Sequence, residues 1–241
     1  MSRMRADLLL VARGLCESRA KARAAIEAGG VTADGARVEK PSDLIADGAA
    51  LDVTPPHPWV SRGGVKLAHA LEAFNVHPTG RICLDIGAST GGFTQVLLSR
   101  GAARVYAVDV GTGQLHASLR DDPRIVNLER TDARALTRDL IPEPPTLIVC
   151  DASFIGAAKV LATPLSLAAP QADLITLIKP QFEAGPNAGK GGVLSEEVAH
   201  SAADAAVTAL DGLEGFRVIA VIDSPIRGGD GNLERLLHAR R

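Results

Sequence analysis

The fold is decided by the stretch Leu84-Asp85-Ile86-Gly87-Ala88-Ser89-Thr90-Gly91-Gly92-Phe93. In this stretch a short apolar run meets an acid and then breaks into a glycine-rich turn. This order is typical of the first strand, ligand-binding loop and helix start of a doubly wound α/β domain. The helix that follows is expected over residues 94–100, because Gly101 is a typical helix end. The stretch therefore predicts a Rossmann-like α/β sheet with helices on both faces.

The glycine loop itself leaves its ligand open. A dinucleotide-binding loop reads Gly-x-Gly-x-x-Gly, whereas residues 87–92 read Gly-Ala-Ser-Thr-Gly-Gly. This departure points away from a pyrophosphate and toward a nucleotide-like ligand without phosphate, such as S-adenosylmethionine. The alternative is that the glycines only let a strand and a helix pack closely, and the loop alone does not decide between the two.

Four apolar runs in the same part of the chain each close on one charged residue. Near-continuous apolar runs are typical of strands buried on both faces of a parallel sheet. The carboxyl ends of such strands share one crevice, so the four charges are expected to converge on one binding cleft, although a single charge could simply end a strand or cap a helix. The runs are 82–85, 105–109, 147–151 and 174–179, and their closing residues are Asp85, Asp109, Asp151 and Lys179.

Asp109, one of these closing residues, and a further acid, Asp132, suggest which ligand the cleft holds. Asp109 follows the glycine loop at about the spacing of the second-strand acid that grips ribose hydroxyls. Asp132, which comes after an apolar pair at 125–126, either takes an adenine amino group or caps the next helix. Acids suit a ligand that carries an amino group and a sulfonium but no phosphate. Together these positions resemble the cofactor motifs of S-adenosylmethionine-dependent methyltransferases, which implies cofactor binding by Asp85, Gly87, Ala88, Ser89, Gly91, Gly92, Phe93, Asp109 and Asp132.

The composition bounds the class of protein. A length of 241 residues favours one large or two unequal domains. Hydrophobic residues make up 46% of the chain and aromatic residues only 3%, so the core is aliphatic, as in many parallel α/β sheets. The net charge of -2 gives no nucleic-acid signal over the chain as a whole, so any such signal must be local.

Cysteine usage and hydropathy indicate the compartment. Cys16, Cys83 and Cys150 are scattered through apolar runs, which suits buried thiols in a reducing cytosol better than disulfides or a zinc site. Residues 1–13 are charged and lack the apolar core of a secretory signal, and residues 160–172 are broken by prolines and too short to span a bilayer. We expect a cytoplasmic protein with no metal and no membrane partner. The sequence indicates no oligomeric state, and a monomer is compatible with it.

Residues 1–54 form a compositionally distinct unit. Helical spacing of apolar residues predicts a first helix that ends at Gly14, and Ser18 is expected to cap a second helix that runs to Ala28. Asp34-Gly35 predicts a tight hairpin after it, and the apolar pairs that follow predict further short strands. The first 23 residues carry six basic and two acidic side chains. A basic helix face could grip a phosphate backbone, although charge alone favours an ordinary solvated face.

The order of these elements resembles a small α+β RNA-binding domain first seen in the fourth small-subunit ribosomal protein. The resemblance spans about fifty residues and is carried by Arg5, Asp7, Ser18-Arg19, Ile26, Gly29, Val31, Asp34-Gly35 and Pro41. It implies binding of structured RNA through the basic second helix. The residues expected to contact RNA are Arg5, Arg19, Lys21 and Arg23, with Arg62 beyond the linker.

Residues 55–60 are a proline-rich linker between this unit and a methyltransferase-like domain over 61–241. Prolines hold such a linker extended and semi-rigid. Trp59, the only tryptophan, is expected to pack at the domain junction, and base stacking is the alternative.

Two lysines supply the chemistry expected at the cleft. Methyl transfer is an in-line displacement, so an enzyme must align the acceptor and make it nucleophilic. A ribose hydroxyl must lose its proton, and Lys179 could accept it once burial and the positive charge of Lys66 favour the neutral amine. Asp151 is expected to orient Lys179. Lys66 on its own would be read as an ordinary exposed helix lysine.

Five motifs resemble those of the TlyA family, bacterial ribosomal-RNA cytidine 2′-O-methyltransferases related to FtsJ/RrmJ enzymes and often labelled hemolysins. The resemblance covers essentially the whole chain and implies S-adenosylmethionine as cofactor and ribosomal RNA within a ribosomal subunit as partner. The Lys-Asp-Lys-Glu tetrad of the family falls on Lys66, Asp151, Lys179 and Glu234, with Glu183 as a rival for the last place. The motifs lie at 59–67, 84–94, 151–155, 179–183 and 231–234, the last on the presumed final strand.

The sequence also supports two further expectations and leaves two alternative functions open. The chain lacks the terminal extensions of family members that modify both subunits, so by resemblance we expect it to act on large-subunit RNA only. The glycine-rich run 184–192 is expected to be a mobile loop that closes over the RNA ribose. Two other classes of function are a non-catalytic RNA-binding assembly factor, which could lose the tetrad, and a membrane-lysing toxin, which needs a spanning or strongly amphipathic segment that is not apparent.

Overall fold

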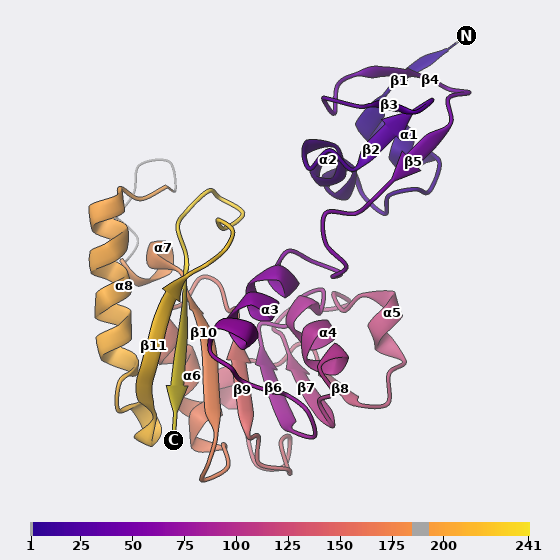
Figure 1. The fold of residues 1–241 in the computed structure, drawn as a ribbon. Helices are drawn as coiled ribbons and strands as arrows, with labels where there is room; N and C mark the ends of the chain where they lie inside the picture. Colours follow the sequence, from indigo (N-terminus) through magenta and orange to yellow (C-terminus); the bar gives the residue numbers. More distant parts are fainter. Residues whose placement is uncertain (1, 185–192) are drawn as a thin grey trace. The chain divides into compact units, whose positions relative to one another are not determined.

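The computed structural model describes residues 2–184 and 193–241, which fall into two compact units (Figure 1). The smaller unit extends to Pro58, and the larger one runs from Trp59 to Arg241. The glycine-rich run at 184–192 lies, apart from Ala184, outside the described residues.

The smaller unit is α+β. Strand β1 (Arg3–Arg5) pairs antiparallel with β4 (Leu44–Ala46), and β2 (Val31–Ala33) pairs antiparallel with both β3 (Ala36–Arg37) and β5 (Leu51–Val53). Helices α1 (Ala6–Ala12) and α2 (Arg19–Glu27) lie against one another. Their apolar sides form a small aliphatic core with the strands, in which Leu10, Ala22, Ile26, Val31 and Val38 are buried.

The predicted cap and hairpin of this unit are confirmed. The Ser18 hydroxyl accepts a hydrogen bond from the backbone N–H of Lys21 at 3.3 Å, so Ser18 caps α2. Asp34 and Gly35 adopt φ values of 51° and 80°, as a two-residue turn with positive φ at both positions requires. Strand β1 was not predicted, because a three-residue strand depends on a partner about forty residues away in the chain.

The larger unit is built on a seven-stranded sheet of order β11-β12-β10-β9-β6-β7-β8. The five strands from β10 to β8 in that order run parallel, and the hairpin of β11 and β12 adds an antiparallel edge. The chain moves outward from β6 through β7 to β8 and then returns to the other side of β6, so the topological switch point lies between β6 and β9. The strands are β6 (Ile82–Ile86), β7 (Arg104–Val108), β8 (Ile125–Leu128), β9 (Leu147–Cys150), β10 (Asp173–Ile178), β11 (Arg217–Asp223) and β12 (Arg235–Arg240).

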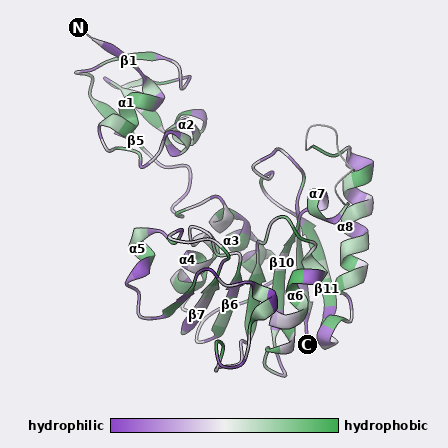
Figure 2. Ribbon diagram, turned by 180° about the vertical axis from the view of Figure 1, so that it is seen from behind, coloured by the Kyte–Doolittle hydropathy of each residue, from purple (hydrophilic) through white to green (hydrophobic). Residues whose placement is uncertain are grey.

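Helices cover both faces of this sheet (Figures 1 and 2). Alternate residues of each strand serve the two faces, so that Cys83 packs toward α3 and α4 whereas Leu84 and Ile86 pack toward α6 and α8. Burial on both faces explains the unbroken apolar runs of the strands. The helices are α3 (Gly63–Ala73), α4 (Gly92–Ser99), α5 (Ala117–Arg120), α6 (Ala157–Ser166), α7 (Pro180–Glu183) and α8 (Glu196–Leu210), with 3-10 turns η1 (Ala133–Ala135) and η3 (Leu213–Gly215).

Helix α4 starts two residues earlier than predicted, at Gly92. Gly91 precedes it with φ of 91°, a conformation that favours glycine. Gly92 and Gly64 permit the close approach of α3, because a Cβ at Gly92 would overlap Ser61 and one at Gly64 would overlap the Trp59 ring. Trp59 therefore packs on α3 as part of the apolar cluster of the larger unit.

All three cysteines are free, and Cys83 and Cys150 are buried as predicted, whereas Cys16 is half-buried. Burial raises the pKa of Cys83 to about 12 and that of Cys150 to about 11, so both thiols stay protonated at neutral pH. In the part of the chain that the structure describes, no helix combines the length and the apolar character that crossing a bilayer requires.

Candidate active site

A cavity of about 550 Å³ lies at the carboxyl ends of the parallel strands. It sits at the switch point, where doubly wound sheets bind their ligands, and its volume is typical of a small-molecule site. Apolar side chains from the ends of β6 and β7 and from the segment after β9 form much of its wall. The polar lining comes from Ser89, Asp109, Gln114, Thr131, Asp132, Arg134, Asp151 and Ser153.

Asp109 directly follows β7 and faces this cavity. Its Oδ2 accepts a hydrogen bond from the backbone N–H of Ser89 at 2.8 Å, and its Oδ1 accepts one from that of Gly111 at 2.7 Å. One carboxylate thus ties the glycine loop to the loop after β7. Because each carboxylate oxygen can accept a second hydrogen bond, Asp109 can still hold a hydroxyl in the cavity.

Asp132 takes one of the two roles that the sequence left open, the capping of the next turn. Its Oδ1 accepts a hydrogen bond from the backbone N–H of Arg134 at 2.9 Å and so caps η1. Both carboxylate oxygens also accept hydrogen bonds from the Arg134 guanidinium, which holds the pKa of Asp132 below its usual range. The side chain lines the cavity as well, so it can cap a turn and remain available to a ligand.

Asp85 does not face the cavity, and the expectation that its charge joins the others there is wrong. Strand β6 continues to Ile86, so Asp85 lies inside the strand, and the alternation of side chains turns it toward α4. It is 0% exposed, and its Oδ2 accepts a hydrogen bond from the Thr94 hydroxyl at 2.6 Å. Burial raises the pKa of Asp85 to about 7, against the opposing effect of the Thr94 hydrogen bond. Asp85 therefore ties the first turn of α4 to β6 through its hydrogen bond with Thr94.

Asp85→Asn should remove a pH dependence of stability. The pKa of the folded protein, about 7, lies above the ordinary value of 3.8, so the folded state binds a proton that the unfolded state has lost. The free energy of unfolding should therefore fall as pH rises from about 4 to about 7. Asparagine keeps an acceptor for Thr94 without a charge. Urea unfolding at about pH 5 and about pH 8 should show the fall in the wild type and a smaller one in the variant, and equal falls would contradict this account.

Two lysine–carboxylate pairs lie at this end of the sheet. Lys179 follows β10, and its Nζ lies 2.6 Å from Asp151 Oδ1. The same amine donates to the Asp151 carbonyl at 3.1 Å and to the Ser153 hydroxyl at 2.9 Å. Lys66 of α3 pairs with Glu234, and both side chains are buried. The four tetrad positions thus form two ion pairs.

The two ion pairs are neighbours through the first turn of α3. A Cβ at Gly63 would lie 3.4 Å from Asp151 Oδ2, so the helix that carries Lys66 begins against the acid that holds Lys179. Lys66 is only 7% exposed, and the reading of it as an ordinary exposed lysine is wrong. Glu234 directly precedes β12, so it lies one residue before the final strand, not on it.

Glu183, the rival of Glu234 for the last place of the tetrad, lies at the start of α6 and not beside Lys66. Its Oε1 accepts a hydrogen bond from the backbone N–H of Ala157 at 2.7 Å, at the start of α6, and burial raises its pKa. The structure pairs Glu234, and not Glu183, with Lys66.

Two residues at this end of the sheet were missed by the sequence reasoning. Phe154 lines the cavity, is 90% exposed and adopts φ of 69°, and its ring centre lies 5.2 Å from that of Phe182. Its position three residues after Asp151, in a segment that follows a strand, was the available signal.

Glu129 accepts hydrogen bonds from three successive backbone N–H groups, those of Gly113, Gln114 and Leu115, at 2.5, 2.9 and 3.2 Å. No local pattern marks Glu129, because its partners lie fourteen to sixteen residues away.

The basic residues of α2 carry less free charge than their sequence suggests. Lys21 pairs with Glu17 at 2.5 Å, and Arg23 pairs with Glu27 at 3.7 Å. Residues 1–58 contain eight basic and eight acidic side chains, so the excess in the first 23 residues is not a property of the whole unit. Arg5 and Arg19 share a buried acid, as described below.

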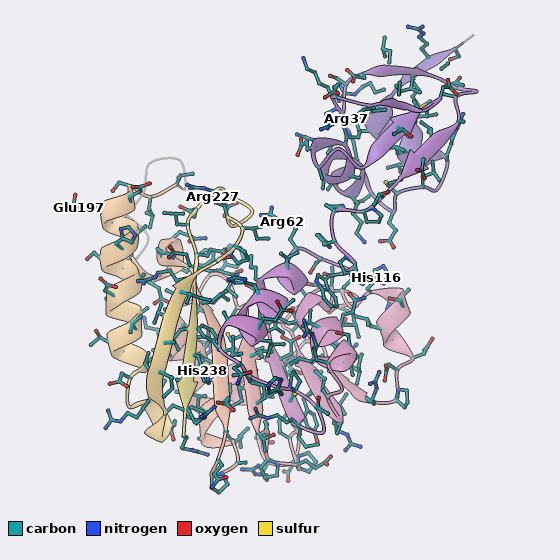
Figure 3. The ribbon with its side chains drawn as sticks, in the orientation of Figure 1. Arg37, Arg62, His116, Glu197, Arg227 and His238 are labelled. Atoms are coloured by element: carbon teal, nitrogen blue, oxygen red, sulfur yellow. The ribbon has the colours of Figure 1, made fainter. Side chains whose placement is uncertain are left out.

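Arg62 lies just before α3 in the larger unit. Its guanidinium donates a hydrogen bond to the Arg227 carbonyl, and the two residues lie side by side in Figure 3. Within residues 2–184 and 193–241, neither arginine makes an ion pair with a carboxylate. Both cations are therefore available to an anionic partner of the larger unit.

Comparison with known proteins agrees with this geometry. Residues 59–241 match the family model of the FtsJ-like methyltransferases, and residues 4–51 match that of the S4 domain. A protein of Mycobacterium tuberculosis named 16S/23S rRNA (cytidine-2′-O)-methyltransferase TlyA is 47% identical over 241 residues, covering 99% of this chain and 90% of that protein. A putative rRNA methyltransferase of Bacillus subtilis, YqxC, is 43% identical over 237 residues, covering 97% of this chain and 84% of that one.

A solved structure extends the comparison to three dimensions. The putative hemolysin from Streptococcus thermophilus is 39% identical and superposes with a TM-score of 0.77, covering 100% of this chain and 89% of that chain. The Rossmann-like sheet, the S4 domain and the family resemblance predicted from the sequence are confirmed. The chain therefore belongs to the TlyA family, and its larger unit is an FtsJ-like, S-adenosylmethionine-dependent methyltransferase.

Proposed function

We propose that this protein methylates the 2′-hydroxyl of a cytidine ribose in ribosomal RNA. The observation that carries the proposal is the ion pair between the Lys179 amine and Asp151, an acid that lines the cavity. The S4 domain supplies a unit suited to RNA, and the M. tuberculosis relative is named for this reaction. Such a substrate places the protein in the cytoplasm, with a ribosomal subunit as its partner.

The cavity fits S-adenosylmethionine. Asp109 would hold the ribose hydroxyls of the cofactor, and Asp132 would accept from the adenine amino group. Gly87 adopts φ of 78°, and a Cβ there would lie 3.0 Å from the backbone of Ala152, so only glycine fits where the loop passes the end of β9. The anionic lining suits a positively charged cofactor without phosphate. When bound, the cofactor would supply an electrophilic methyl group.

The hydrogen bonds of Lys179 indicate where the acceptor enters. Its amine donates hydrogen bonds to the Asp151 carbonyl and to the exposed hydroxyl of Ser153, and it also forms an ion pair with Asp151 Oδ1. A ribose hydroxyl can replace Ser153 without disturbing the other two contacts. The Lys179 amine then serves as the general base that takes the proton from the 2′-oxygen, and Asp151 stabilises the ammonium that forms. The Lys66–Glu234 pair supports the turn of α3 that faces Asp151.

Ser153→Ala should leave methylation within about twofold of the wild-type rate, since its hydroxyl only fills the place that the ribose takes. Single-turnover transfer of a labelled methyl group to ribosomal RNA measures this rate. A loss as large as that expected for a Lys179 variant would show that Ser153 acts in the proton transfer and would contradict the assignment.

Glu129→Gln should weaken cofactor binding about tenfold. The carboxylate holds the loop that carries Gln114, and a glutamine offers one acceptor oxygen in place of two and sets an amide NH₂ against backbone N–H groups. Isothermal calorimetry with S-adenosylmethionine measures the affinity without catalysis. Glu143→Gln is the matched control, because Glu143 bonds Arg104 and Tyr106 away from the cavity. Equal affinities of both variants would contradict the role of Glu129.

Mapping of ribose methylation in ribosomal RNA, from cells with and without this protein, tests the proposed function. The expected result is one class of cytidine 2′-O-methyl mark that disappears with the protein. Unchanged methylation would favour a non-catalytic assembly factor. The subunit whose RNA loses the mark identifies the substrate.

A further inference from the structure

A buried acid connects two arginines of the smaller unit. Asp7, the second residue of α1, is 0% exposed. The Arg5 guanidinium donates to both of its oxygens at 3.0 Å, and Arg19 Nε donates to Oδ2 at 2.8 Å. Arg5 ends β1 and Arg19 opens α2, so two separate elements bring their guanidinium groups onto one carboxylate.

The two guanidinium groups remain accessible from outside. The side chains of Arg5 and Arg19 are 40% and 55% exposed. Arg5 uses Nε and Nη2 on Asp7, and Arg19 uses only Nε. Since a guanidinium has five N–H donors, each arginine keeps donors for a second anion.

The charge of this cluster differs from that of its neighbours. Two cations share one anion, so the cluster carries a net positive charge within a unit whose basic and acidic residues balance. The acids that pair with Lys21 and Arg23 are 59% exposed and would repel a phosphate. Asp7 is hidden in the core, and hydrogen bonds from Arg5 and Arg19 hold its pKa well below its usual range, so it stays ionised. Among the ion pairs described for α2, only the pair of Arg19 has a buried acid.

We propose that Asp7 is a positioning residue for RNA: it fixes Arg5 and Arg19 as a two-guanidinium clamp for one backbone phosphate. The inference rests on the proposed function, because it needs RNA as the partner. Arginine side chains are rotamer-rich, and ordering them at an interface costs affinity. Asp7 orders both during folding, so the phosphate meets a preformed fork, and guanidinium groups bind phosphates with two parallel hydrogen bonds.

Asp7→Asn separates positioning from charge, because the two effects have opposite signs. Removing an anion makes the unit more positive, so charge alone predicts tighter RNA binding. Loss of positioning predicts weaker binding. Asp52→Asn is the matched control, since Asp52 is an exposed acid of β5 and its loss changes the charge equally.

Binding of the full-length protein to deproteinised large-subunit ribosomal RNA, measured over a series of salt concentrations, tests the proposal. We expect Asp7→Asn to bind about tenfold more weakly, with a salt slope lower by about one, and Asp52→Asn to bind as tightly as the wild type or slightly more tightly. Equal or tighter binding by Asp7→Asn would overturn the positioning role. Failure of the wild type to bind this RNA would overturn the proposed function as well.

A second variant covers the case in which Asp7→Asn unfolds the smaller unit. Arg5→Lys with Arg19→Lys keeps both charges and the buried acid but removes the forked donors. This double variant should match the tenfold loss at unchanged melting temperature. If it binds as the wild type does, the clamp is wrong whatever the fate of Asp7→Asn.

Discussion

Lys179→Ala is expected to lower the single-turnover rate of methyl transfer about a thousandfold, the effect of removing a positioned general base. The amine directly follows β10 and lies 2.6 Å from Asp151, which lines the cavity. Its loss leaves the 2′-proton without an acceptor. Cofactor affinity measured by calorimetry should remain close to that of the wild type, because Asp109 and Asp132 are untouched.

Lys159→Ala provides the control for this experiment. Lys159 is an exposed lysine of α6, so its removal takes away the same charge without touching the tetrad. Its turnover should be unchanged. Near-normal turnover of Lys179→Ala would show that another group removes the proton.

Glu234→Ala is expected to cost both stability and activity. Lys66 is 7% exposed and Glu234 4% exposed, so the variant leaves a buried cation without its partner. Breaking such a pair typically costs about 3 to 5 kcal/mol of unfolding free energy. The disturbed first turn of α3 also faces Asp151, so methyl transfer should fall with stability.

A double variant separates these two losses. Lys66→Met with Glu234→Leu replaces the pair by apolar side chains of similar size and should recover most of the stability, but not the activity. Glu72→Ala, which breaks the exposed pair with Arg100, should cost less than about 1 kcal/mol. Urea unfolding and turnover measure both quantities. A stability loss for Glu234→Ala no larger than that of Glu72→Ala would contradict the buried pair.

Much of the cleft could be predicted from the sequence because strand ends leave a local signal. Apolar runs that close on Asp109, Asp151 and Lys179 form parallel strands of one sheet, β7, β9 and β10, with β6 between β7 and β9. Their carboxyl ends therefore lie at the same edge of the sheet. Asp85 shows the limit of that reasoning. Its strand runs one residue further, to Ile86, and a one-residue shift in a strand exchanges the two faces of the sheet.

The remaining site residues depend on contacts that no local pattern encodes. The pairs Glu17–Lys21 and Arg23–Glu27 have the helical spacing of four and were visible in the sequence, although their effect on the basic face was not counted. In contrast, Asp7 meets Arg19 across twelve residues and Lys66 meets Glu234 across 168. The same holds for Glu129, whose partners lie on a neighbouring loop. Such contacts follow from the completed fold.

The identity of the methylated atom tests the central claim most directly. Unmethylated large ribosomal subunits are incubated with the protein and methyl-labelled S-adenosylmethionine, and the RNA is digested to nucleosides and analysed by mass spectrometry. The account predicts label in 2′-O-methylcytidine with the wild type and none with Lys179→Ala. Label on a cytosine base, or no labelled nucleoside with the wild type, would contradict it.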